Sequence, residues 1–159
     1  MGMDFKDRAR RTREYIALMK ELWTKSDPVY RGRTVGIEGF KFEPKPVQRP
    51  HPPIVFGGNK EPSLKRAAEL GDGWYGYGMD DMAETRATIA RLREYERAAN
   101  RSAPLEVTVS PQRGNEITLE QVKQMEAMGV SRVILAAGMG TRDMLAGMER
   151  IHDTLISKI

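Results

Sequence analysis

Two adjacent glycines, Gly57 and Gly58, end a short apolar run and are followed by Asn59 and by a helix predicted from Pro62. A glycine lets backbone amides approach a phosphate closely, and the first turn of a helix presents unpaired amides and the positive end of its dipole. The same pair is an ordinary choice for a tight turn between a strand and a helix. The pattern therefore indicates either a turn alone or a turn that holds a phosphate-bearing group.

A second glycine-rich strand exit lies near the end of the chain and contains Gly138, Gly140, Thr141 and Arg142. Thr141 is placed to cap the last helix, and an arginine can pair with a phosphate. In barrels of eight βα units, phosphate often binds in the loops after the seventh and eighth strands. If the chain supplies the last four units, this segment is a rival phosphate site.

Aromatic residues gather in one predicted strand, which contains Trp74, Tyr75 and Tyr77. Side chains alternate along a strand, so Trp74 faces one side and the two tyrosines face the other. Burial in the core is the default expectation for all three. Tyr77 and Gly78 stand at the carboxyl end of the strand, where barrel ligands bind, and are candidates to line a ligand site.

Other chemistry is poorly represented. The chain has no cysteine and only two histidines, so no metal site is expected. His51 lies between prolines and His152 falls on a helix, and we expect a structural and a surface role for them. Asp72 precedes a strand and is expected to form a turn rather than to act as an acid. No nucleophile–base pair can be identified, and the catalytic residues remain unknown.

The composition is that of a globular protein, with 40% hydrophobic and 30% charged residues among 159. No apolar run approaches the ~20 residues that span a bilayer, and no secretory signal is evident, so we expect a cytoplasmic protein without membrane contact. The net charge is +4. The basic residues near the N-terminus lack interleaved aromatic residues, so a solvated helix face is expected rather than a nucleic-acid site. They are Lys6, Arg8, Arg10, Arg11 and Arg13.

Hydrophobic periodicity divides the chain into a helix over 1–25, a loop with a hairpin over 26–53, and four βα units over 54–159. The predicted strands cover residues 53–56, 73–77, 105–109 and 132–136, and each is followed by a helix. Thr118 and Gln121 predict a capping box at the start of the third of these helices. Alternating strands and helices indicate an α/β fold with parallel strands and right-handed crossovers.

Four βα units are half of a (β/α)₈ TIM barrel, which usually needs ~250 residues. We therefore expect a single domain, 1–159, that is a partial barrel formed from the second half of the fold. Such a sheet leaves two unpaired edges, which proteins seldom expose. Either a homo-oligomer or a missing N-terminal half is expected to cover them.

An ordered set of motifs resembles the luciferase-like monooxygenase family, and most closely its deazaflavin-dependent members. The motifs are the run 5–15, Leu22-Trp23-Thr24, the stretch 42–54 that contains Pro46-Val47-Gln48-Arg49-Pro50, the pair Gly57-Gly58, and Gly71-Asp72-Gly73-Trp74. The resemblance implies a TIM barrel of which the first four strands are absent. It also implies that Gly57 and Gly58 approach the phosphate-bearing side chain of the cofactor.

The resemblance further implies a cofactor, either the deazaflavin coenzyme F-420 or FMN. The other cofactor-binding candidates are Asn59, which follows the glycine pair, and Tyr77 and Gly78, at the carboxyl end of the next predicted strand. The expected function is the C-terminal part of a flavin- or deazaflavin-dependent oxidoreductase or monooxygenase acting on a small organic substrate. The alternative is a non-catalytic half-barrel that dimerises and at most binds a phosphate-bearing ligand.

Overall fold

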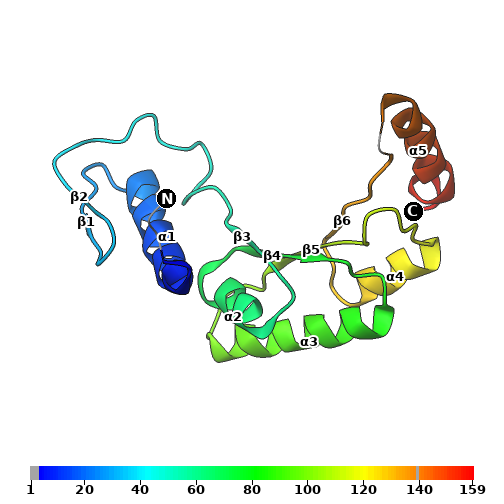
Figure 1. Ribbon diagram of the computed structural model, residues 1–159, viewed down its shortest axis with the longest axis horizontal. Coiled ribbons are helices and arrows are strands. Elements are labelled where there is room, and N and C mark those ends of the chain that lie inside the picture. Colours follow the sequence, from blue (N-terminus) through cyan, green and yellow to red (C-terminus); the bar gives the residue numbers. More distant parts are fainter. Residues whose placement is uncertain (1–3, 139) are drawn as a thin grey trace. The chain divides into compact units, whose positions relative to one another are not determined.

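The computed structural model of the chain describes residues 4–138 and 140–159, apart from the side chains of Thr141 and Arg142. The chain divides into two compact units whose boundary lies between Pro53 and Ile54 (Figure 1). The first unit contains a 3-10 helix, η1 (Phe5–Asp7), the helix α1 (Arg8–Thr24), and two short strands, β1 (Tyr30–Arg31) and β2 (Gly36–Ile37). The two strands pair antiparallel, which confirms the predicted hairpin.

Helix α1 is joined to the hairpin through Glu14. Its Oε2 accepts a hydrogen bond from the Thr34 amide at 2.6 Å. Hydrogen bonds from the backbone, chiefly from Thr34, lower the pKa of Glu14, and desolvation opposes them. Ionised Glu14 is therefore the form that holds the hairpin.

Three basic residues of the N-terminal segment make local contacts. The Arg8 guanidinium lies 4.0 Å from the centre of the Phe5 ring, Arg10 pairs with Asp7 at 3.0 Å, and Arg11 donates to the Asp4 carbonyl at 2.9 Å. All three contacts are made within the segment 4–11.

The second unit contains the four predicted βα units. Its strands are β3 (Val55–Gly57), β4 (Gly73–Tyr77), β5 (Glu106–Ser110) and β6 (Arg132–Val133). They form one parallel sheet in the order β3-β4-β5-β6. The helices that follow these strands are α2 (Glu61–Leu70), α3 (Met82–Ala98), α4 (Leu119–Ala127) and α5 (Thr141–Thr154), and a 3-10 helix, η2 (Ile156–Lys158), ends the chain. The unit is thus the α/β partial barrel that the sequence predicts.

Local sequence signals set several of the helix boundaries. The Thr118 and Gln121 side chains form the predicted capping box at the start of α4. Asp81 caps α3 by accepting hydrogen bonds from the amides of Ala83 and Glu84. Helix α4 is followed by Gly129 with a φ of 82°, a conformation that favours glycine.

Strand β6 is shorter than the predicted run 132–136. Val133 is registered with Val109, and the Ile134 amide donates to the Val109 carbonyl at 2.9 Å. Strand β5 ends one residue later, at Ser110, and Pro111 follows it. Residues beyond Ile134 therefore have no neighbouring strand on that side with which to continue the ladder.

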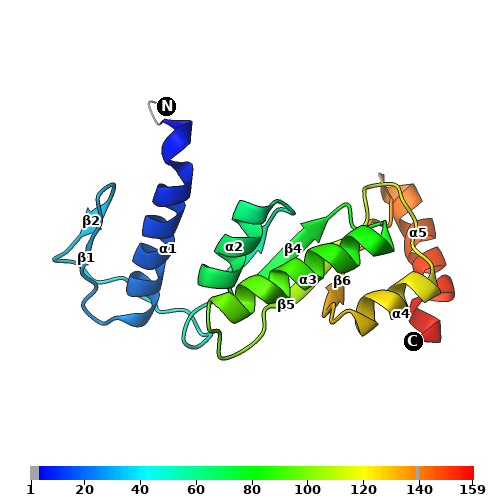
Figure 2. The same ribbon diagram turned by 90° about the horizontal axis from the view of Figure 1, so that it is seen from below.

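The sheet has two chemically different faces. The side chains of residues paired across neighbouring strands point to the same side of the sheet. Phe56, Trp74 and Val107 are paired in this way and form one layer of buried side chains. Helices α2, α3 and α4 lie on this side of the sheet (Figures 1 and 2). On the other side, Val55 and Tyr77 are each 51% exposed. Trp74 and the two tyrosines therefore face opposite ways, as predicted.

The last helix is held close to the segment that precedes it. A Cβ at Gly147 would clash with the Ala137 carbonyl oxygen, so only glycine fits at this position of α5. Met144 and Met148 of α5 are exposed, whereas Leu155, which directly follows the helix, is buried. The apolar face of α5 is therefore covered at its C-terminal end only.

Within the described parts of the chain, no helix is both long enough and apolar enough to cross a membrane.

Gly76 is predicted to be essential for the packing of β4. A Cβ at this position would clash with the Trp74 ring, which is fully buried. Gly76→Ala should lower the free energy of unfolding by about 1–3 kcal/mol because the added Cβ would overlap a buried ring. Gly57→Ala is the matched control, since its Cβ would meet only the Tyr75 carbonyl at 3.9 Å. Urea denaturation of both variants tests this, and equal midpoints for the two would contradict it.

Candidate cofactor site at the carboxyl edge of the sheet

The predicted cofactor-binding residues lie on two neighbouring strands. Gly57 ends β3 and is followed by Gly58 and Asn59, while Tyr77 ends β4 and is followed by Gly78. The Asn59 Nδ2 donates to the Tyr77 carbonyl at 2.7 Å, which joins the two strand exits. The structure therefore brings these residues together at the carboxyl edge of the sheet; cofactor contact itself remains a prediction.

The turn after β3 is fixed by the buried tryptophan of β4. The Trp74 indole Nε1 donates to the Gly58 carbonyl at 3.0 Å. Gly58 has a φ of 105°, and a Cβ there would lie 2.9 Å from Ser63 Oγ. The position thus requires glycine for two reasons, its backbone conformation and the close approach of α2.

The first turn of α2 offers a limited anion site. Lys60 is the N-cap residue and makes no side-chain cap, so the Glu61 amide is among those that the helix cannot pair internally. Pro62 contributes no amide, and the Ser63 amide already donates to the Lys60 carbonyl at 2.9 Å. The helix therefore presents fewer free donors than the sequence pattern suggests.

The charge in this first turn is balanced. The Glu61 carboxylate pairs with Lys65 at 2.7 Å. The Lys65 hydrogen bond, followed by that of Tyr95, lowers the pKa of Glu61, and the Glu61 hydrogen bond raises the pKa of Lys65. Lys65 thus offsets a negative charge that would oppose a phosphate.

One buried polar atom at this edge has no partner. Asn59 Oδ1 is shielded from solvent and accepts no hydrogen bond within the described part of the chain. An unpaired buried acceptor is costly, so a donor is expected here.

A pair of hydroxyl groups lies on the open face of the sheet. The Tyr75 hydroxyl and Ser110 Oγ are 2.7 Å apart, which joins β4 to β5. Ser110 is buried and Tyr75 is half-buried. Because one hydroxyl donates to the other, the remaining proton is available to a further acceptor on this face.

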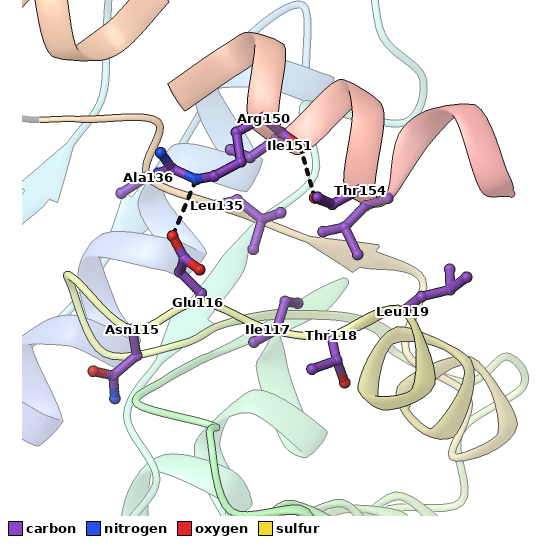
Figure 3. A pocket seen from close by; sticks show the side chains of 11 residues that line it. Asn115, Glu116, Ile117, Thr118, Leu119, Leu135, Ala136, Arg150, Ile151 and Thr154 are labelled. Atoms are coloured by element: carbon purple, nitrogen blue, oxygen red, sulfur yellow. Dashed lines mark hydrogen bonds and ion pairs between the residues drawn. The ribbon is translucent and has the colours of Figure 1, made fainter. Parts of the chain in front are cut away.

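A cavity of about 350 Å³ lies between the loop that follows β5 and helix α5 (Figure 3). Apolar side chains, including Ile117, Leu135 and Ile151, contribute to its wall. Glu116 and Arg150 pair across it, with 3.0 Å between Oε1 and Nε. The volume is within the ~300–1,000 Å³ typical of small-molecule pockets.

The rival phosphate site lies apart from the candidate site at the ends of β3 and β4. Gly138 and Gly140 follow β6, and β5 lies between β4 and β6 in the sheet. Helix α5 begins at Thr141, so its N-cap position is Gly140, and the prediction that Thr141 caps the helix is wrong in this respect. The side chains of Thr141 and Arg142, which the rival site needs, lie outside the described residues.

Other residues singled out in the sequence have structural contacts. Asp72 accepts a hydrogen bond from the Ile54 amide at 2.8 Å, at the amino end of β3, which is the opposite edge from the candidate site. His51 contacts the Pro52 carbonyl, and exposed His152 lies 3.1 Å from Asp153. Within residues 4–138 and 140–159, no group of three potential ligands is arranged to hold a metal ion.

Sequence reasoning missed several polar residues of this region, namely Asp80, Ser110, Glu116 and Arg150. Ser110 was the easiest of these to predict, because it directly follows the predicted strand 105–109 at the ligand-binding edge. The contact between Glu116 and Arg150 joins residues far apart in the sequence, and no local pattern marks it.

The chain is similar to known proteins over most of its length. Residues 1–114 match the family model described as luciferase-like monooxygenase. An uncharacterized protein of Mycobacterium bovis is 33% identical over 135 residues, which cover 85% of this chain and 45% of that protein. An FMNH2-dependent dimethylsulfone monooxygenase of Pseudomonas putida is 29% identical over 91 residues, which cover 57% of this chain and 25% of that enzyme.

Solved structures share the fold. A coenzyme F-420 dependent tetrahydromethanopterin reductase from Methanopyrus kandleri aligns with a TM-score of 0.74 at 12% identity, covering 94% of this chain and 63% of that one. A monooxygenase from Streptomyces bottropensis aligns with a TM-score of 0.71 at 16% identity, covering 98% and 63%. The chain spans less than half the length of the two curated relatives from Mycobacterium bovis and Pseudomonas putida.

The Tyr75–Ser110 contact is predicted to stabilise the open face. Tyr75→Phe and Ser110→Ala, made singly and together, should give a coupling free energy of about 0.5–1.5 kcal/mol in a double-mutant cycle of urea unfolding. Ser102→Ala is the control partner for Tyr75→Phe, because Ser102 precedes β5 at its other end, and this pair should be additive. A coupling no larger than that of the control pair would show that the hydroxyl contact contributes nothing.

Proposed function

Because the chain belongs to the luciferase-like monooxygenase family, we propose that it forms the cofactor-holding part of an oxidoreductase acting on a small organic substrate. The cofactor is a deazaflavin, coenzyme F-420, or FMN. The observation that carries this proposal is the carboxyl edge of β3 and β4, where the Gly58 turn, Asn59 and Tyr77 meet. Ligands of open and closed parallel α/β sheets bind at this edge.

The residues present fit a ribityl phosphate chain. Asn59 Oδ1 is a buried acceptor without a donor, and a ribityl hydroxyl supplies one. The glycine turn leaves no side chain between the backbone and a phosphate, and the Glu61 amide lies at the start of the helix that follows this turn. Tyr77 contributes an exposed aromatic ring on the open face beside this edge.

The bound cofactor would supply the redox chemistry, while the protein binds, orients and shields it from water. The chain's own part is to hold the phosphate-bearing side chain through Gly58 and Asn59. The hydroxyl pair of Tyr75 and Ser110 holds a proton on the open face of the sheet. The cavity beside Glu116 and Arg150 is the candidate site for the substrate.

Turnover is proposed to need more than this sheet. The strands at its two edges, β3 and β6, each pair with one neighbour only among the described residues. Eight strands make a closed barrel, and closure removes exposed edges. We propose that further βα units, from a missing N-terminal half or from a second copy of the chain, complete the barrel.

Titration of the purified chain with FMN and with coenzyme F-420, followed by absorbance, tests cofactor binding. Glu61→Gln removes a negative charge from the first turn of α2 and should tighten binding of either cofactor about two- to fivefold. Glu69→Gln is the matched control, because it removes the same charge near the other end of α2.

Equal effects of the two substitutions would contradict a phosphate at the start of α2. Failure of either cofactor to bind, together with a solution mass of two chains, would favour the alternative of a half-barrel that dimerises without turnover. Binding by the chain alone would establish it as the cofactor-holding part.

A further inference from the structure

The loop that follows β5, residues 111–118, is fastened to the segment between β4 and α3 by one carboxylate. The Gln112 amide donates to the Asp80 carboxylate, at 2.9 Å from Oδ2 and 3.2 Å from Oδ1. The Asn115 side-chain amide donates to Asp80 Oδ1 at 3.1 Å. The Asn115 backbone amide also donates to the Gln112 carbonyl at 2.9 Å, so Asp80 closes both ends of a turn.

The same loop contacts the candidate cofactor edge. The Arg113 amide donates to the Tyr77 hydroxyl at 3.2 Å. Because this hydroxyl lies at the far end of the ring from the backbone, the contact fixes the direction of the ring. The loop and the exposed Tyr77 ring are therefore positioned together.

On its other side the loop forms a wall of the cavity. Asn115 and Glu116 both line it, and Glu116 holds Arg150 of α5 (Figure 3). One loop of eight residues thus contacts both the strand edge and the cavity.

We propose that Asp80 is a positioning residue that fixes the loop 111–118 and thereby sets both the Tyr77 ring and the wall of the cavity. Its effect on the cofactor rests on the proposed function. A carboxylate suits this role because both of its oxygens accept hydrogen bonds, whereas an asparagine would turn an amide donor toward the loop donors. The neighbouring Asp81 has a different task, since it accepts from the amides of Ala83 and Glu84 and caps α3.

Substitutions at two adjacent residues distinguish the loss of the Asp80 contacts with the loop from the loss of a negative charge. Asp80→Asn and Asp81→Asn each remove one negative charge, and asparagine is as good an N-cap as aspartate. Hydrogen exchange of backbone amides, read by NMR, reports on the loop, and titration with FMN and coenzyme F-420 reports on the cofactor edge.

Asp80→Asn should speed exchange at the Gln112 and Arg113 amides about tenfold, the effect of losing one charge-assisted hydrogen bond. Amides in the centre of β5 should exchange faster by no more than the measured loss of global stability allows. Cofactor affinity should fall about fivefold or more, whereas Asp81→Asn should leave loop exchange and affinity within about twofold of wild type. Tyr77→Phe should speed exchange at Arg113 and not at Gln112.

Unchanged exchange at Gln112 in Asp80→Asn would overturn the proposal that Asp80 fixes the loop. Faster exchange with wild-type cofactor affinity would overturn its positioning role and leave the proposed function standing. If the wild-type chain binds neither cofactor, the proposed function fails and the cofactor role of Asp80 fails with it, while the exchange data still decide whether Asp80 fixes the loop.

Discussion

The Trp74 side chain determines how the second unit is arranged. It is completely buried on the side of the sheet that the helices cover, and the absence of a side chain at Gly76 leaves room for its ring. Strand alternation then places Tyr75 and Tyr77 on the open face. The indole also donates to the Gly58 carbonyl, so the same residue fixes the turn at the end of β3. The polar edge of the sheet therefore depends on a contact in its core.

The elements of the fold were largely predictable because the local signals agree with one another. Apolar runs ending in glycine marked β3 and β4, and the capping box of Thr118 and Gln121 marked the start of α4. The length of β6 was not predictable from its own residues, because it is limited by the end of the neighbouring strand at Ser110. Local sequence propensity therefore determines which helices and strands form, whereas pairing with a neighbouring strand determines where a strand such as β6 ends.

The candidate site was predictable in part. Gly58 and Asn59 could be singled out because a glycine pair at a strand end has a local sequence signature, and the structure joins them to Tyr77. Asp80 carries no such signature: its partners, Gln112 and Asn115, lie more than thirty residues away. The free donors of α2 are fewer than the pattern suggests, because Pro62 has no amide and Ser63 is already bonded. To predict contacts between the ends of different strands, the order of the strands in the sheet must be known, and local sequence patterns do not give it.

Because the chain belongs to the luciferase-like monooxygenase family and forms a partial barrel, we propose that a cofactor binds at the carboxyl edge of β3 and β4. NMR chemical-shift mapping of backbone amides during titration with FMN or coenzyme F-420 measures this most directly. A cofactor held at the carboxyl edge of β3 and β4 should give its largest shifts on residues 57–61 and 77–78. Shifts confined to residues 138–142, or to the opposite edge of the sheet near Ile54 and Asp72, would contradict this placement.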